Sequence, residues 1–225
     1  MAAQEPVYDS LSTGIDNFDS VLEEDGFVPG STITVVADPA SVGDLLVYNF
    51  TGGRDTFYLT TARREDDVKG KIRAAGNERA EIEYFGLEDQ PVIESAANAL
   101  REMDVDEQST IVVDPVNSME DSPGVDYREF LAGLNDLAVR TGSLVVLLCL
   151  QEAESSDVPV NRWRTKHMSD SVFKVIHNVS TNNVEDYLTL EKLSPEQNLV
   201  DESMRVFKLP RELDMDIDTK KNMSP

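Results

Sequence analysis

Residues 31–50 read Ser-Thr-Ile-Thr-Val-Val-Ala-Asp-Pro-Ala-Ser-Val-Gly-Asp-Leu-Leu-Val-Tyr-Asn-Phe, and this stretch decides the fold of the chain. The β-branched and apolar residues at 31–37 predict a buried strand, and the apolar residues from about 43 to 51 predict a helix. A polar loop that contains a proline separates the two. A strand followed by a short loop and a helix is the repeating unit of a parallel α/β sheet.

The loop at 37–44 has the length and position of a phosphate-binding Walker A loop, Gly-x-x-x-x-Gly-Lys-Ser/Thr, but all four motif positions differ. The two glycines are replaced by Ala37 and Val42. The lysine is replaced by Gly43, and the hydroxyl residue that binds magnesium is replaced by Asp44. A β-branched residue resists the backbone angles that glycine adopts, and a carboxylate repels phosphate oxygens. The sequence therefore predicts the frame of a phosphate loop without its chemistry.

Ser41 and Asp44 have the Ser-x-x-Asp spacing of a capping box at the start of the helix. We expect their side chains to satisfy N–H groups at the helix start, with the Asp44 carboxylate in place of a phosphate. On this hypothesis Asp44 stabilises the fold in the absence of a nucleotide.

The rest of the chain alternates apolar strands with helices up to residue 150 and then changes pattern. Apolar strands of this kind are typical of a mainly parallel central sheet with helices on both faces. The later strands, joined by a turn at 180–183, indicate antiparallel strands at the C-terminal edge. We expect one α/β domain over residues 1–210 and a disordered, charged tail over 211–225. The expected strands are 31–37, 56–60, 82–85, 110–114, 143–150, 170–177, 184–191 and 204–209, and the expected helices are 43–51, 65–75, 91–103 and 127–141.

The charge of the chain is strongly negative, with 43 Asp and Glu residues against 20 Lys and Arg residues and a net charge of −23. The carboxylates are spread along the sequence, which is typical of proteins that work in molar salt, where charges are screened over about 3 Å. We interpret the chain as halophilic and archaeal; an ordinary acidic protein is the alternative. The same charge argues against nucleic-acid binding, which depends on cationic residues.

No apolar run approaches the roughly 18–20 residues that span a bilayer. The N-terminal residues lack the basic and apolar regions of a signal peptide, so we expect a cytoplasmic protein without membrane contact. The one cysteine, Cys149, lies inside an apolar run and is interpreted as a small buried hydrophobic residue.

Four short motifs follow one another in a specific order. They are Leu-Ser-Thr-Gly-Ile at 11–15, Pro-Gly-Ser at 29–31, Tyr-Leu-Thr-Thr at 58–61 and Ile-Val-Val-Asp at 111–114. Together they resemble the RecA superfamily, and within it the KaiC-like and archaeal RadA-like ATPases. The resemblance covers residues 8–209. It implies a RecA-like P-loop fold in which the last motif is the Walker B strand.

The resemblance also implies where the catalytic parts of an ATPase should lie. The Walker B aspartate is present as Asp114. The family's water-activating glutamate, which follows the Tyr-Leu-Thr-Thr strand, is replaced by Ala62 and Arg63. The family's late Lys-x-Arg motif reads Lys192-Leu-Ser here. Three of the four parts, including the altered loop, are missing, so we expect no catalysis, no cofactor and no metal, with Asp114 as a polar residue at a strand end.

The most basic stretch of the chain, residues 161–167, contains its one tryptophan. By the resemblance this region corresponds to a central loop that faces nucleic acid or a protein partner. Arginine and tryptophan are frequent at interfaces, and an aromatic ring among cations can stack on a base. The alternative is a solvent-exposed loop that pairs with nearby acids such as Glu152 and Glu154. The residues of this candidate interface loop are Arg162, Trp163, Arg164 and Lys166.

The sequence therefore favours a catalytically inactive RecA/KaiC-like domain that acts as a regulatory or scaffolding protein, with signal transduction as one setting. Its expected partner is a protein, such as a RecA-like paralogue or a signalling complex. Two alternatives remain: a nucleotide-sensing protein that uses Asp114 without hydrolysis, and a recombinase-paralogue accessory factor that contacts DNA. Homo-oligomers also remain open, because members of the family often form hexamers.

Overall fold

The computed structural model of the chain describes residues 8–85, 92–151, 158–180, 183–195, 197–201 and 206–209, and the expected tail at 211–225 lies outside them. The strands are β1 (Thr32–Ala37), β2 (Thr56–Thr60), β3 (Ala80–Tyr84), β4 (Thr110–Asp114), β5 (Leu144–Leu150), β6 (Ser171–Ser180), β7 (Asn183–Lys192) and β8 (Val206–Leu209). The helices are α1 (Asp16–Asp19), α2 (Gly43–Phe50), α3 (Glu65–Ala74), α4 (Val92–Glu102), α5 (Asn117–Glu120), α6 (Gly124–Thr141) and α7 (Arg162–Met168).

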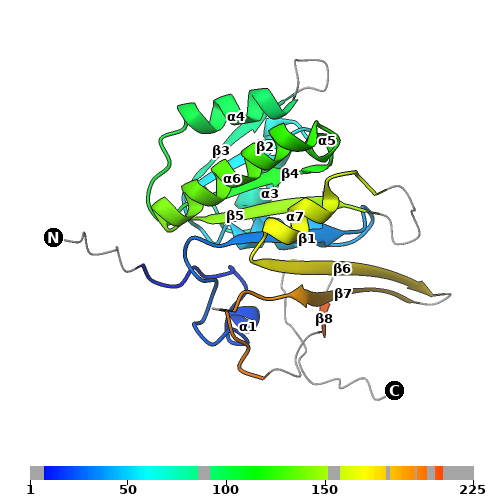
Figure 1. Cartoon of the computed structure of the whole chain (residues 1–225). Helices are drawn as coiled ribbons and strands as arrows, with labels where there is room; N and C mark the ends of the chain where they lie inside the picture. The colour runs from blue at the N-terminus through cyan, green and yellow to red at the C-terminus, as the bar shows by residue number, and fades with distance from the viewer. Residues whose placement is uncertain are drawn as a thin grey trace.

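An eight-stranded sheet runs through the molecule in the order β3-β2-β4-β5-β1-β6-β7-β8 (Figure 1). Neighbouring strands pair in parallel through β3, β2, β4, β5, β1 and β6. Strands β7 and β8 then add antiparallel pairs at the C-terminal edge. This confirms the predicted α/β fold class. Strand β1 lies between β5 and β6, so Ala37 at its carboxyl end is next to Leu150 of β5. Ligand sites of parallel α/β sheets lie at these carboxyl ends.

Helices cover both faces of the sheet because the side chains of each strand alternate between two cores. Ile33 and Val35 of β1 join the core beneath α1, α2 and α3, whereas Val36 joins the core beneath α4, α5, α6 and α7. In the first core the buried rings of Phe18 and Phe50 stack with their centroids 6.1 Å apart. This packing holds α2 against the sheet and so positions the loop between β1 and α2.

Most of the predicted elements are present with small shifts at their ends. Strands β2 and β4 have the predicted bounds, and the helix predicted at 127–141 begins three residues earlier, at Gly124. Part of the predicted turn at 180–183 lies outside the described residues. Within the described part of the chain, none of the helices has both the length and the hydrophobicity needed to cross a membrane.

Two short helices, α5 and α7, do not appear in the sequence pattern. The loop predicted at 161–167 is wrong, since most of this stretch forms α7. The buried face of α7 carries Arg162 and Thr165, and Glu120 of α5 is also fully buried. Hydrophobic periodicity reports a helix only when its buried face is apolar, so these two helices give little signal.

Candidate functional site

Three backbone N–H groups in and next to the loop between β1 and α2 donate to the loop's own oxygen atoms. The N–H of Ala40 donates to Asp38 Oδ1 at 2.9 Å, and the N–H of Ser41 donates to the Asp38 carbonyl oxygen at 2.9 Å. The N–H of Gly43 donates to Ser41 Oγ at 3.2 Å. From residue 37 to 43 no backbone φ is positive, so the loop lacks the left-handed residues of a phosphate-binding nest.

The capping box expected from Ser41 and Asp44 does not form. Helix α2 begins after Val42, whose φ and ψ are −82° and 16°, and no side chain caps the helix. The Ser41 hydroxyl donates instead to the Asp38 carbonyl oxygen at 2.6 Å. Because the helix starts one residue later than a capping box requires, Asp44 lies at the second helical position and cannot pair with Ser41.

Ala37 and Gly43, two of the altered motif positions, pack directly against each other. A Cβ atom added at Gly43 would lie 2.3 Å from the Cβ atom of Ala37, far inside van der Waals contact. Any side chain at position 43 would therefore collide with the methyl group at position 37. The space beside the start of α2 is already filled by the end of β1.

Asp44 forms an ion pair with Arg63, which lies in the turn after β2. Arg63 Nη2 donates to Asp44 Oδ2, and Arg63 Nη1 donates to the hydroxyl group of Tyr48 on the same helix as Asp44. About three quarters of each charged side chain is buried, at 22% and 24% exposure. Burial raises the pKa of Tyr48 to about 12, so its hydroxyl group stays protonated. Two positions that the sequence analysis singled out, 44 and 63, thus meet as one pair of opposite charges.

Asp114 lies at the end of β4 beneath this ion pair and is 1% exposed. The Tyr58 hydroxyl donates to Asp114 Oδ2, whereas Asp114 Oδ1 is buried without a hydrogen-bond partner. Burial raises the pKa of the Asp114 carboxyl above its ordinary value. The rings of Tyr48 and Tyr58 lie 6.1 Å apart, which connects the two pairs. We call these five residues, Asp44, Tyr48, Tyr58, Arg63 and Asp114, the Arg63 cluster.

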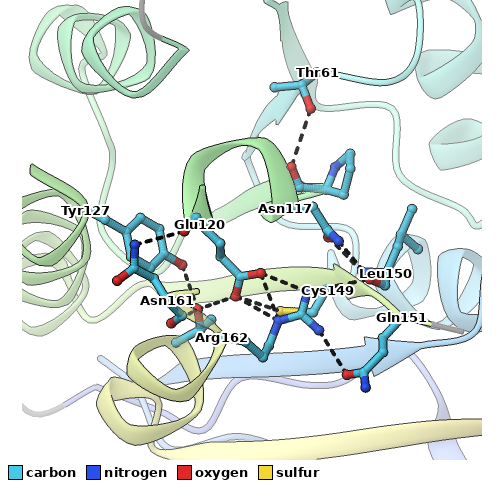
Figure 2. Close-up of polar contacts among 11 residues, drawn as sticks. Thr61, Asn117, Glu120, Tyr127, Cys149, Leu150, Gln151, Asn161 and Arg162 are labelled. Atoms are coloured by element: carbon cyan, nitrogen blue, oxygen red, sulfur yellow. Dashed lines mark hydrogen bonds and ion pairs between the residues drawn. The ribbon is translucent and has the colours of Figure 1, made fainter. Parts of the chain in front are cut away.

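A second polar cluster lies at the carboxyl end of β5 and joins α5 to α7 (Figure 2). Arg162 Nε lies 2.8 Å from both carboxylate oxygens of Glu120, and Arg162 Nη2 lies 2.7 Å from Glu120 Oε2. The Thr165 hydroxyl also donates to Glu120, and the Cys149 thiol lies 3.8 Å from Glu120 Oε1. Burial raises the pKa of the Cys149 thiol, which keeps it protonated. We call Glu120, Cys149, Arg162 and Thr165 the Glu120 cluster.

Arg162 is not available at the candidate interface, because the Glu120 cluster buries it and the residue is only 3% exposed. Lys166 pairs with Glu191 at 2.7 Å, and the alternative partners Glu152 and Glu154 lie outside the described residues. Trp163 is 60% exposed, and the Arg164 guanidinium lies 4.7 Å from the centroid of its ring. Of the four predicted residues, Trp163 remains exposed, with Arg164 half-buried beside it.

A sequence comparison assigns the chain to a family. A family model described as a family of unknown function, DUF7125, matches residues 10–223. The chain belongs to this family. No curated protein matches the chain in sequence.

Solved structures show the same fold. A KaiC-like protein from the hyperthermophilic archaeon Pyrococcus horikoshii superposes with a TM-score of 0.68 over 94% of this chain and 99% of its own. The two sequences are 16% identical, so the likeness concerns the fold alone. It supports the predicted KaiC-like RecA fold.

The sequence identified Asp44, Arg63 and Asp114 as separate altered or retained positions but did not bring them together. Tyr48 and Tyr58 lie in an apolar helix and an apolar strand, so their pattern indicates only core residues. Glu120 gives no signal, because a carboxylate in a short polar segment is typical of a surface. The arginine at position 63, where the resemblance to KaiC-like ATPases implies a glutamate at 62 or 63, is the one clue to the ion pair.

The Asp44–Arg63 ion pair predicts a small but measurable coupling. Replacing Asp44 by alanine is expected to lower the free energy of unfolding by about 1 kcal/mol, the upper range for a partly exposed pair. In an Arg63→Ala background the same change should cost less, by about 0.5–1 kcal/mol, because the partner is absent. Urea denaturation of the two single variants and the double variant at fixed KCl gives the coupling.

The exposed pair Glu65 and Lys69, whose charged atoms lie 3.8 Å apart on α3, is the matched control and should show almost no coupling. Equal losses for Asp44→Ala in both backgrounds would show that the ion pair adds nothing to stability.

Proposed function

We propose that this chain is a catalytically inactive RecA/KaiC-like domain that works as a regulatory or scaffolding protein in the cytoplasm of a halophilic archaeon. Its partner in this proposal is another protein, such as a RecA-like paralogue or a signalling complex. The observation that carries the proposal is the Asp44–Arg63 ion pair, which joins two positions where an ATPase of this fold needs a hydroxyl group and a glutamate.

The loop geometry supports the proposal, because phosphate binding needs free backbone N–H groups that converge on one point. In this loop the N–H groups of Ala40, Ser41 and Gly43 already donate to oxygen atoms of Asp38 and Ser41. Opening the loop for a triphosphate would break these hydrogen bonds. The residues present therefore do not fit a nucleotide phosphate.

The charges support it as well. The carboxylates of Asp38 and Asp44 lie in and beside the loop, and the Arg63 cation is neutralised by Asp44. A repulsive contact of unit charges at 4 Å costs about 1–4 kcal/mol, depending on exposure. A lysine at position 43 would collide with the methyl group of Ala37 unless the backbone shifts. Asp114, which the resemblance identifies as the magnesium-binding aspartate, is buried and hydrogen-bonded to Tyr58, so it is poorly placed to reach magnesium bound to ATP.

Calorimetric titration of magnesium-ATP and of ADP into the protein at about 2–3 M KCl tests the proposal, with the salt chosen to screen the acidic surface. We expect no heat of binding up to millimolar nucleotide. Micromolar binding would overturn the proposal and favour the nucleotide-sensing alternative.

A matched pair of variants makes the titration sharper. Arg63→Ala with Asp44→Ala removes the ion pair but keeps the loop hydrogen bonds, so it should still bind no nucleotide. Binding that appears only in this double variant would show that the ion pair, rather than the loop, excludes the nucleotide.

A further inference from the structure

An exposed apolar patch lies on α7 and on the residues just before it. Val160 is 78% exposed and Trp163 is 60% exposed, and the guanidinium of Arg164 stacks on the indole ring. We call Val160, Trp163 and Arg164 the α7 patch. Large exposed side chains of this kind, with tryptophan beside arginine, are enriched at the centres of protein interfaces.

The Glu120 cluster holds the α7 patch in place. Arg162 and Thr165 point inward to Glu120, so Trp163, one position after Arg162, points outward on the same short helix. Arg164 is half-buried beside it, with its Nε atom buried and its guanidinium against the indole ring. Arg164 Nη1 also donates to the carbonyl oxygen of Gly124 at 3.3 Å, which ties the patch to the start of α6. A patch fixed in this way loses little side-chain freedom when it binds.

A groove between α4 and α6 offers a surface that fits this patch. Its volume is about 1000 Å³, and apolar side chains that include Leu100, Phe130 and Leu137 line it. An indole ring fits a groove of this size and chemistry. Gly133 of α6 lies in the lining, and nothing lies within 4 Å of a Cβ atom built there.

The charges of the two surfaces are complementary. Within the described residues, neither Arg164 nor any carboxylate of the groove has an ion-pair partner. The groove holds four carboxylates against two arginines, so it is acidic. A cationic patch seated in it would place Arg164 near unpaired acids. The four carboxylates are those of Glu94, Asp104, Asp126 and Glu129.

We propose that the α7 patch of one copy of this chain binds the α4–α6 groove of a second copy, forming a two-fold symmetric dimer. Both surfaces lie on the same face of the sheet, with α4 on one side of α6 and α7 on the other (Figure 1). A two-fold axis over α6 therefore brings each patch to the other copy's groove. Two equal contacts close the assembly at two chains. The inference uses no residue of the Arg63 cluster, so it stands apart from the proposed inactivity.

Higher salt concentration is expected to strengthen this association. Each chain carries a net charge of −23, so two copies repel each other strongly at low ionic strength. At about 2–3 M KCl screening acts within roughly 3 Å, which removes the long-range repulsion and leaves the apolar contact. The dimer should be stable in molar KCl and weaken as the salt is diluted.

Sedimentation velocity of the full chain at about 2–3 M KCl, over protein concentrations from about 1 to 100 μM, measures the association. We expect a dimer for the natural chain. Trp163→Ala removes the ring, and Gly133→Gln fills the groove without a clash; each should weaken the dimer at least about tenfold. Gly70→Gln on α3, where an added Cβ atom also meets nothing within 4 Å, lies on the opposite face and should change nothing.

A mixing experiment separates the patch–groove contact from a general loss of association. A heterodimer of Trp163→Ala with Gly133→Gln keeps one intact contact, between the unchanged patch and the unchanged groove. It should therefore form more tightly than either variant with itself. Thermal melts followed by circular dichroism check that each variant is folded.

Three results would overturn the proposal. The first is a monomer at every concentration and salt level, and the second is a dimer that none of the substitutions weakens. The third is a larger assembly sensitive to the same substitutions, because it would contradict the two-fold arrangement.

Discussion

Replacing Arg162 by alanine is expected to lower the free energy of unfolding by about 3–5 kcal/mol. The change leaves the Glu120 carboxylate, which is fully buried, without its cation. The remaining donors are the hydroxyl group of Thr165 and the thiol of Cys149, which are neutral and compensate only part of the charge. Urea denaturation at fixed KCl measures the loss.

Two further variants test whether the lost charge pair is the cause. Arg164→Ala, two positions along the same helix, removes a half-buried cation that has no carboxylate partner among the described residues, and should cost no more than about 1 kcal/mol. Arg162→Met with Glu120→Gln removes both charges, so it should recover much of the loss. Equal losses for Arg162→Ala and Arg164→Ala would contradict the role of the buried pair.

Replacing Asp114 by asparagine is expected to raise the free energy of unfolding at neutral pH by about 1 kcal/mol. Asp114 is buried, and one of its carboxylate oxygens has no hydrogen-bond partner. The amide of asparagine keeps an oxygen atom for the Tyr58 hydroxyl group and removes the cost of burying a charge. This variant should therefore melt at a higher temperature than the natural chain at pH 7.

The pH dependence of this difference has a definite sign. Burial raises the pKa of Asp114 in the folded state above its ordinary value near 3.8. The buried charge of Asp114 therefore lowers the free energy of unfolding at every pH above the folded-state pKa. This loss disappears as the pH falls below the pKa of the unfolded state. The advantage of Asp114→Asn should be largest near pH 7 and should shrink toward pH 4. Thermal melts of both proteins from pH 7 to 4 measure it, and an advantage independent of pH would exclude titration of Asp114 as its source.

The sequence predicts the sheet and the longer helices because their buried faces are apolar. Runs such as 110–114 and 144–150 consist almost wholly of β-branched and aliphatic residues, which favour buried parallel strands. The order of short motifs predicts the RecA-like arrangement, which the KaiC-like structure supports. Helices α5 and α7 are missed for the opposite reason, since Glu120 and Arg162 form polar parts of their buried faces.

The candidate site is predictable only in part. The sequence identifies each Walker A residue that the loop at 37–44 lacks. It does not identify the ion pair between Asp44 and Arg63 that is present instead. Asp44 and Arg63 are 19 positions apart and meet only because α2 packs against β2 and its following turn. The same holds for Glu120 and Arg162, which are 42 positions apart. Contacts over this sequence separation depend on tertiary packing, and local hydrophobic periodicity does not predict them.

The contact between Ala37 and Gly43 also limits which substitutions this loop can accept. A lysine at position 43 alone would collide with the methyl group of Ala37, which lies 2.3 Å from the added Cβ atom. A glycine at position 37 alone would leave a methyl-sized void at the end of β1 and loosen the backbone there. Each single step toward a lysine-bearing loop therefore costs stability before any lysine can act. A lysine therefore fits at position 43 only when position 37 changes as well, so the two positions are coupled by packing.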